Sequence, residues 1–183
     1  MGFQETGIEG LMVYEPRIFH DDRGYFFESY NDKIFQEAGF SRPWVQDNQA
    51  RSSYGVIRGL HFQHEPHAQT KLIRALEGAI LDVVVDIRKG SATYGKVFAI
   101  ELSASNKRQL VVPRGFAHGY SVLSETAEIL YKCDNFYNKA AEGGIRYDDP
   151  ALNIDWRIAV ADAVLSDKDV ALPTLAEAEN HFA

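Results

Sequence analysis

The sequence predicts an all-β fold, a barrel or sandwich of about ten strands with a few short peripheral helices. Apolar side chains recur with a period near two in short runs, which is the spacing of a strand with one buried face. Turn residues separate these runs at the short intervals that are typical of antiparallel strands. The chain has 183 residues, of which 45% are hydrophobic, and shows no linker or repeat. We therefore expect residues 1–183 to form a single domain around one core.

The expected strands alternate in polarity and end near Gly, Pro, Asn, Asp or Ser residues. In chain order they span residues 12–15, 25–30, 45–52, 56–62, 71–76, 79–87, 96–102, 109–112, 119–123 and 127–133. The segment 79–87 is the most apolar of them, but Asp82 and Asp86 interrupt it. It is also far shorter than the ~20 apolar residues of a membrane-spanning helix, so we interpret it as a strand.

Residues 31–39 depart from the strand pattern. Asn31 is of a type that caps helix N-termini, and Gly39 is a typical helix stop. Between them, Ile34, Phe35 and Ala38 form a short apolar stripe, so we expect one short helix here. Near the end of the chain, the Ala- and Glu-rich sequence LAEAEN follows a proline and predicts a terminal helix.

The charge balance limits the classes of partner. The chain carries 19 Lys and Arg against 26 Asp and Glu, a net charge of −7. A nucleic-acid groove needs a concentrated positive field, so we expect no nucleic-acid partner. The N-terminal sequence MGFQETGIEGL lacks a basic region followed by an apolar one, so we expect a cytoplasmic protein with no membrane anchor. A single cysteine, Cys133, rules out an intramolecular disulfide.

Positively charged side chains nevertheless occur inside segments that are otherwise apolar or aromatic. Arg23 precedes GYFFE and Arg58 lies in GVIRGLH. Lys71 opens KLIRAL and Lys168 lies in LSDKD. A few clustered cations dominate the potential of a cleft, and the planar fork of arginine matches two phosphate oxygens. These residues predict a site for a small anion, although each one also fits an ordinary surface position with a packed stem.

The histidines are unevenly placed. His61, His64 and His67 lie in HFQHEPH, and His118 lies in PRGFAHG. The pattern Pro-x-Gly-x-x-His that ends at His118 is the second half of the cupin signature, which predicts a jelly-roll barrel. Clustered histidines also suggest a metal site, but a metal-binding cupin needs His two residues after His61, where Gln63 stands. A metal-dependent enzyme that uses His61, His64 and His118 remains an alternative.

Two further side chains are candidates for acid–base chemistry. Tyr131 shares a strand face with Ile129 and Cys133, so it is either a core tyrosine or a proton donor that faces the barrel interior. Asp167, in LSDKD, is either a turn residue or a carboxylate of the same site. The residues by themselves leave the reaction open.

Taken together, these segments resemble one family, the dTDP-4-dehydrorhamnose 3,5-epimerases, over nearly the whole chain. The sequence RGLHFQ joined to PRGFAHG is the most specific part of the resemblance. The matching stretches are residues 19–30, 46–63, the strand that begins at Lys71, 82–95, 112–137 and 143–169. The resemblance implies a cupin jelly roll that forms homodimers and uses no metal or other cofactor.

The resemblance also implies catalytic roles. The C4 ketone of the family's substrate, dTDP-4-dehydro-6-deoxy-glucose, acidifies the protons at C3 and C5. Epimerisation then needs a base, an acid on the opposite face and a group that stabilises the enolate. His61 matches the family's base, and Asp167 matches the carboxylate that orients it. Tyr131 matches the proton donor, and Lys71 matches the residue near the developing negative charge on O4.

Binding residues follow from the same resemblance. Positions that contact the sugar or the pyrophosphate are matched by Arg23, Gln46, Asn48, Arg58, His118 and Lys168. Tyr137 matches an aromatic side chain that stacks on thymine, and Glu28 and Glu142 match positions that contact the nucleotide. The family exchanges its N-terminal strand between subunits, so Arg23, Phe26 and Glu28 are expected to complete the site of the partner.

One feature of strand 56–62 conflicts with this assignment. Strict alternation places Arg58 and His61 on opposite faces, whereas the resemblance needs both at one site. Gly59 lies between them, and a β-bulge at this glycine would re-aim one of the two side chains. A mono-epimerase of a related dTDP-4-ketosugar and a non-catalytic sugar-nucleotide-binding cupin remain alternatives to the double epimerase.

Overall fold

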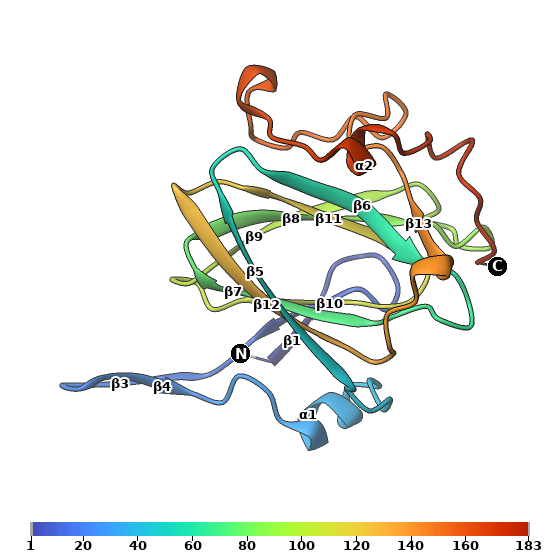
Figure 1. The fold of residues 1–183 in the computed structure, drawn as a ribbon. Helices are drawn as coiled ribbons and strands as arrows, with labels where there is room; N and C mark the ends of the chain where they lie inside the picture. The colour runs from blue at the N-terminus through green and yellow to red at the C-terminus, as the bar shows by residue number, and fades with distance from the viewer. Residues whose placement is uncertain (1, 183) are drawn as a thin grey trace.

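Two antiparallel β-sheets lie face to face and enclose the core (Figure 1). The structure, a computed structural model, describes residues 2–182. The first sheet has the strand order β1-β2-β10-β7-β12-β5, and the second has the order β13-β6-β11-β8-β9. The strands β3 and β4 form a separate hairpin that extends away from both sheets in Figure 1. This architecture is the cupin-type jelly roll that the sequence predicts.

The strand positions agree closely with the alternating segments of the sequence. The strands are β1 (Gly2–Glu5), β2 (Met12–Glu15), β3 (Ile18–Asp21), β4 (Gly24–Phe27), β5 (Gln46–Ser53), β6 (Ile57–Gln63), β7 (Lys71–Glu77), β8 (Ala79–Asp86), β9 (Val97–Ser103), β10 (Gln109–Val112), β11 (Phe116–Val122), β12 (Thr126–Cys133) and β13 (Glu142–Gly144). The sequence pattern missed β1, β3 and β13, which have three or four residues each.

The helical segments are short. They are α1 (Asp32–Glu37), α2 (Asp167–Val170) and the 3₁₀ turns η1 (Lys139–Ala141) and η2 (Val160–Asp162). The expected helix after Asn31 is confirmed, since the Asn31 side chain accepts a hydrogen bond from the Lys33 amide at the start of α1. Within residues 2–182, no helix has the length and apolar character to cross a membrane.

The prediction of a terminal helix in LAEAEN is wrong, because this segment forms only turns. Leu175, Ala178 and Phe182 pack against the second sheet, and the Asn180 side chain donates a hydrogen bond to the Ile87 carbonyl. These contacts hold the end of the chain along the sheet surface and override its helical propensity.

Alternation along the strands divides the apolar side chains between two layers. Inward-facing residues of both sheets form the core of the barrel, including Ile73, Val84 and Ile129. The outward face of the second sheet is covered by residues 145–182, which cross above it in Figure 1 and bury Trp156. Residues 145–182 therefore extend the core without forming a strand of either sheet.

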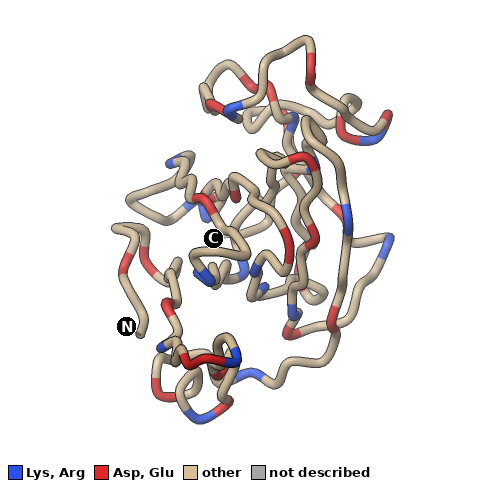
Figure 2. The backbone as a smooth tube through the Cα atoms, turned by 90° about the vertical axis from the view of Figure 1, so that its left-hand side faces the viewer, with Lys and Arg blue, Asp and Glu red and all other residues tan. Residues whose placement is uncertain are grey.

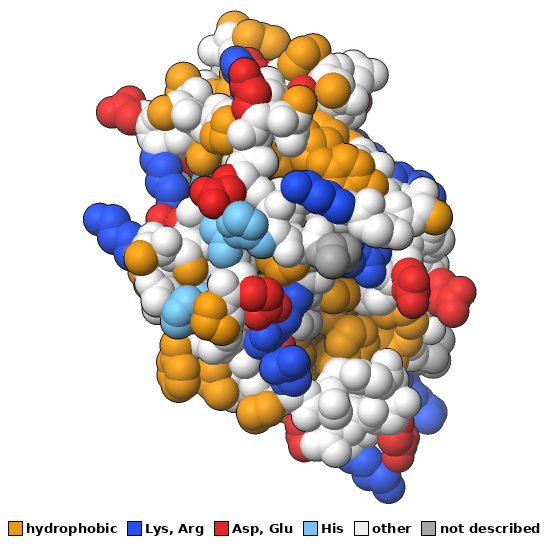
Figure 3. All heavy atoms as spheres, turned by 90° about the vertical axis from the view of Figure 1, so that its right-hand side faces the viewer, with side chains coloured by type: hydrophobic (Ala, Val, Ile, Leu, Met, Phe, Trp, Pro, Cys, Tyr) orange, Lys and Arg blue, Asp and Glu red, His pale blue; other side chains and the backbone are white. Residues whose placement is uncertain are grey.

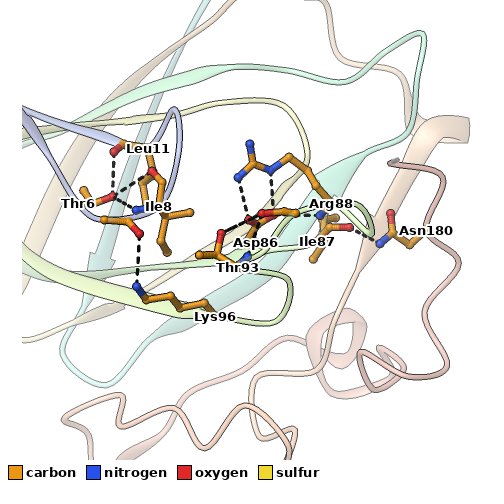
Figure 4. A network of polar contacts seen from close by, with 11 residues as sticks. Thr6, Ile8, Leu11, Asp86, Ile87, Arg88, Thr93, Lys96 and Asn180 are labelled. Atoms are coloured by element: carbon orange, nitrogen blue, oxygen red, sulfur yellow. Dashed lines mark hydrogen bonds and ion pairs between the residues drawn. The ribbon is translucent and has the colours of Figure 1, made fainter.

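Strand β8 is buried along almost its whole length, which explains its apolar sequence. Its two acidic residues have specific partners. Asp86 accepts hydrogen bonds from the Arg88 guanidinium and from the hydroxyls of Ser91 and Thr93 (Figure 4). Burial by itself would raise the pKa of Asp86, but these hydrogen bonds outweigh it and lower the pKa to about 2. The carboxylate thereby fixes the turn that follows β8.

Strand β6 contains the bulge that the sequence predicts at Gly59. His61 pairs with His118 and Arg58 pairs with Tyr120, so three steps along β6 match two steps along β11. The extra residue turns both Arg58 and His61 toward the interior. Gly59 has a φ of +122°, and a β-carbon there would lie 2.5 Å from the Gly119 Cα, so only glycine fits.

We expect Gly59→Ala to lower the free energy of unfolding by about 3 kcal/mol, because it adds a backbone clash to an unfavourable φ. Gly24→Ala is the matched control. Gly24 has a similar φ of +130°, but nothing lies within 4 Å of its added β-carbon. This control should lose only about 1 kcal/mol. Urea denaturation of both variants measures the difference, and equal losses would contradict the close approach of β6 to β11.

Candidate functional site

A cavity opens between the two sheets at one end of the barrel. Its larger part has a volume of about 520 Å³ and its smaller part about 260 Å³. His61, Lys71 and Tyr131 line both parts, so the two adjoin at these side chains. Its size is typical of a site for a small organic ligand. Both sheets contribute its walls, and α2 closes one side.

A histidine–aspartate pair lies at the centre of the cavity. His61 Nε2 is 2.6 Å from Asp169 Oδ1, and Asp169 is 4% exposed. The expectation that Asp167 orients His61 is therefore wrong. Both aspartates belong to α2, but residues two apart on a helix point about 200° apart around its axis, so only one can face the histidine. Asp167 is exposed and lies outside the residues that line the cavity.

The protonation of Asp169 determines which atom of His61 can act as a base. Burial favours a raised pKa for Asp169, but hydrogen bonds from His61, Ser166 and the Gly59 amide outweigh it and lower the pKa. A carboxylate only accepts hydrogen bonds, so His61 Nε2 carries the proton and donates it to Asp169. The lone pair of the neutral ring is then on Nδ1, which is free to accept a proton from a ligand.

Tyr131 and Lys71 approach from the sheet opposite His61. Tyr131 belongs to β12 and Lys71 to β7, whereas His61 belongs to β6. Burial raises the pKa of Tyr131, so its hydroxyl stays protonated over a wide pH range. Burial lowers the pKa of Lys71, and the carboxylates of Asp82 and Glu142 oppose that shift. The cavity thus places a base on one wall and a proton donor and an amine on the other.

A second buried histidine–aspartate pair lies beside the first. His118 Nε2 is 2.9 Å and 3.0 Å from the two carboxylate oxygens of Asp82. His118 pairs with His61 across the β6–β11 ladder, so the two rings line the same wall. Arg58 also faces this space, and its guanidinium donates hydrogen bonds to the Ser52 hydroxyl at 3.2 Å and 3.3 Å. This wall can donate hydrogen bonds to an electronegative ligand.

The smaller part of the cavity is lined by amides and an exposed tyrosine. Tyr137 N–H donates to Gln46 Oε1 at 3.1 Å, and Gln46 Nε2 donates to Asn48 Oδ1 at 3.0 Å. Because the Tyr137 backbone N–H can only donate, the orientation of both side-chain amides is set, and each amide keeps an N–H for a ligand acceptor. Lys168 Nζ lies 2.8 Å from Glu142 Oε2 at the rim. Tyr137, 53% exposed, offers a flat ring for stacking.

Comparisons with known proteins identify the family to which this site belongs. The family model for dTDP-4-dehydrorhamnose 3,5-epimerase matches residues 5–177. The chain belongs to the dTDP-4-dehydrorhamnose 3,5-epimerase family. A curated family member from Shigella flexneri is 51% identical over 171 residues, which cover 93% of this chain and 93% of that protein.

Solved structures of family members agree with this assignment. The crystal structure of a dTDP-4-dehydrorhamnose 3,5-epimerase from Elizabethkingia anophelis has a TM-score of 0.93 and 52% identity, and the match covers 97% of each chain. A dTDP-6-deoxy-D-glucose-3,5-epimerase from Legionella pneumophila was solved in complex with dTDP-4-keto-L-rhamnose. It has a TM-score of 0.92 and 44% identity, over 96% of this chain and 93% of that one. This chain is therefore an isomerase of the epimerase type.

Most of the residues that the family resemblance singled out come together in the cavity. These are His61, Tyr131, Lys71, Gln46, Asn48, Arg58, His118, Tyr137, Glu142 and Lys168. The hairpin residues do not reach it within one chain. Phe26 is 70% exposed on β4, Arg23 pairs only with its neighbour Asp21 among the described residues, and Glu28 is exposed just after β4.

The three histidines of the metal-dependent alternative do not form one group: His61 and His118 lie side by side in the cavity, but His64 does not join them. His64 packs between the rings of Phe62 and His181, with ring centroids 5.2 Å and 5.1 Å away, and does not line the cavity. Figure 3 shows histidine, acidic and basic side chains close together on one face of the molecule. Between residues 2 and 182, no group of three His, Cys, Asp or Glu side chains is arranged to hold a metal ion.

The sequence reasoning missed Asp169 and Ser166. A usable signal is present, because Ser166 and Asp169 have the Ser-x-x-Asp spacing of a helix N-cap followed by an acidic third residue. Such a spacing predicts that the Asp169 side chain turns back toward the start of the helix. It therefore favours Asp169 over Asp167 as the residue fixed in place.

We expect Lys71→Met to raise the free energy of unfolding at pH 7 by about 1 kcal/mol or more, because it removes a desolvated ammonium. The folded pKa of Lys71 is below its value in the unfolded chain. The unfolded chain therefore binds the proton more tightly, and the gain should shrink as the pH rises toward the ordinary lysine pKa near 10.4. Urea denaturation between pH 7 and pH 10 tests this.

Lys132→Met provides the control for that experiment. Lys132 follows Tyr131 on the opposite face of β12, and its ammonium is 3.0 Å from Asp47 Oδ1. Its replacement should cost at most about 1 kcal/mol, as for other partly exposed ion pairs. A Lys71→Met variant that is less stable than the parent at pH 7 would show that the ammonium is a net stabilising group.

Proposed function

We propose that this chain converts dTDP-4-dehydro-6-deoxy-α-D-glucose to dTDP-4-dehydro-β-L-rhamnose by inverting C3 and C5. The observation that carries the proposal is the placement of His61 and Tyr131 on opposite walls of one cavity, with Lys71 beside Tyr131. Inversion of a carbon needs a proton to leave from one face and another to arrive on the opposite face. The family membership agrees with the reaction, which belongs to the biosynthesis of dTDP-L-rhamnose.

The proposed chemistry balances at each carbon. Nδ1 of His61 accepts the proton from C5 or C3, and the electron pair of the C–H bond moves toward the C4 carbonyl to form an enolate. The imidazolium is stabilised by Asp169, whose oxygen is 2.6 Å from Nε2. The Lys71 ammonium offsets the negative charge on O4. Tyr131 then donates its hydroxyl proton to the opposite face of the carbon, and solvent restores both residues.

Binding roles follow from the parts of the cavity. Tyr137 stacks on the thymine, while the free N–H groups of Gln46 and Asn48 donate to acceptors of the ligand. Arg58, His118 and Lys168 hold the sugar or the pyrophosphate, and Glu142 contacts the nucleotide. Acidic and basic residues are interspersed along the backbone (Figure 2), and the net charge of the chain is −7. Arg58, Lys71 and Lys168 nevertheless line the cavity, where they favour an anionic ligand.

We further propose that two copies of the chain form a homodimer through the β3–β4 hairpin. Phe19, Tyr25 and Phe26 expose about half or more of their surfaces there, at 49%, 56% and 70%. Aromatic side chains exposed together mark an interaction surface. Strand β5 lies at the edge of its sheet and carries cavity residues, so a partner hairpin laid along this edge brings Arg23, Phe26 and Glu28 to the site.

We propose the cytoplasm as the place of action. The one cysteine, Cys133, is a buried free thiol, and burial raises its pKa to about 11, so it is chemically inert in the fold. A fold that depends on no disulfide is suited to a reducing compartment.

In deuterated water, the chain should introduce deuterium at both C3 and C5 of the 4-ketosugar, as read by proton NMR. Tyr131→Phe should uncouple exchange from inversion, because His61 still forms the enolate but the opposite face has no donor. We expect inverted product to fall by about 10²-fold or more while exchange with retained configuration continues. His61→Asn should lose exchange at both carbons and still bind dTDP.

Other outcomes would select the other candidate functions. Deuterium at one carbon would identify a mono-epimerase, and binding without any exchange would identify a sugar-nucleotide-binding protein. Loss of exchange on chelation, with recovery on adding Fe(II) or Mn(II), would identify a metal-dependent enzyme.

If each site is built from two subunits, two inactive variants should restore activity when they form a heterodimer. In a heterodimer of Arg23→Ala and His61→Ala chains, one site carries both substitutions and the other carries neither. Random pairing of the two variants should therefore restore about a quarter of the parental activity per subunit. Mixing after partial denaturation and refolding, followed by the exchange assay, measures this. A mixture as inactive as its components would show that Arg23 acts on the site of its own chain or on none.

A further inference from the structure

The carboxylate of Asp169 is held by more than the histidine that it orients. Ser166 Oγ donates a hydrogen bond to Asp169 Oδ2 at 2.7 Å and accepts one from the Asp169 amide at 3.2 Å. The same hydroxyl is therefore the N-cap of α2 and a donor to the side chain at the third helical position. These two bonds fix the backbone and the carboxylate of Asp169 together.

The two oxygens of this carboxylate have separate partners. Oδ2 faces Ser166, and Oδ1 faces His61 Nε2. Without the Ser166 hydroxyl, Asp169 would keep His61 and the Gly59 amide as donors, but its carboxylate could rotate more freely and Oδ1 would be held less firmly in line with the imidazole. The Ser166 hydroxyl thus restricts the rotation that would misalign the pair.

The surroundings of α2 make this restriction necessary. The helix contains only Asp167–Val170, which is too short to hold its own conformation without a cap. Lys168 and Val170 are exposed on either side of Asp169, so the described packing holds α2 on one side only. Ser166 itself reaches the wall of the cavity, next to the carboxylate.

We propose that Ser166 is a positioning residue for catalysis, which holds Asp169 so that His61 keeps Nδ1 directed at the substrate. The inference rests on the proposed function, because it assigns Ser166 to the base of that reaction. Ser166 need not touch the substrate, and its effect on the reaction passes through Asp169.

Ser166→Ala should lower kcat for deuterium exchange by about tenfold and leave KM nearly unchanged, because the lost bond is to a charged group that the substrate does not contact. Ser166→Thr keeps the hydroxyl and should restore most of the rate. The hydrogen bond from Ser166 lowers the pKa of Asp169, so carbon-13 NMR of Ser166→Ala should show the Asp169 pKa rising.

Thr174→Ala is the matched control. Thr174 Oγ1 donates to Glu177 Oε2 at 2.7 Å, which repeats the same hydroxyl-to-carboxylate spacing of three residues at a turn away from the cavity. This variant should exchange deuterium at the parental rate. Thermal unfolding of both variants separates a loss of fold from a loss of alignment.

The decisive comparison uses Asp169→Ala as the background. If Ser166 acts through Asp169, adding Ser166→Ala to Asp169→Ala should change the residual exchange rate by less than about twofold. An additional loss of about tenfold, or a rise in KM, would show that Ser166 acts directly on the substrate and would overturn the proposal. A Ser166→Ala variant with parental kcat would also overturn it. An inactive parental chain would instead refute the proposed reaction.

Discussion

One extra residue in strand β6 sets the geometry on which the site depends. The bulge at Gly59 turns Arg58 and His61 to the same side of the sheet, and the Gly59 amide also donates to Asp169. In a regular strand, one of the two would face the layer formed by residues 145–182, where its polar head would be buried among apolar side chains. Gly59 and Gly119 approach each other so closely that neither has space for a β-carbon. The geometry of the site therefore requires glycine at both positions.

The side chains that are candidates for acid–base chemistry lie on both sheets of the jelly roll, and the barrel core separates these sheets. His61 comes from one sheet, and Tyr131 and Lys71 come from the other. A ligand between the sheets is therefore approached from two sides by groups on rigid strands. This arrangement lowers the stability of the fold, because it buries the amine of Lys71 inside the barrel, where burial lowers the pKa of that amine. The surrounding apolar core supplies the stability that offsets this cost.

The C-terminal segment, residues 145–182, covers the second sheet and also carries Asp169 to the cavity. Residues 145–182 bury Ile145, Leu152 and Trp156 against the second sheet, and the same segment then carries α2 to the mouth of the cavity. The apolar contacts place the helix, and the Ser166 cap orients its third residue. The position of the Asp169 carboxylate thus depends on packing across the outer face of the sheet.

Alternation and residue type by themselves determined the sheet-forming segments, the helix after Asn31 and the inward direction of Tyr131, because these follow from local periodicity and capping. The bulge at Gly59 was predicted only with the family resemblance added, because alternation by itself places Arg58 and His61 on opposite faces. The choice between Asp167 and Asp169 was decided by the tertiary structure. A helix points the two residues to nearly opposite sides. The Ser-x-x-Asp spacing favours Asp169, and the docking of α2 is what brings this residue to His61. The turns in LAEAEN have the same cause, because contacts with the sheet outweigh local helical preference.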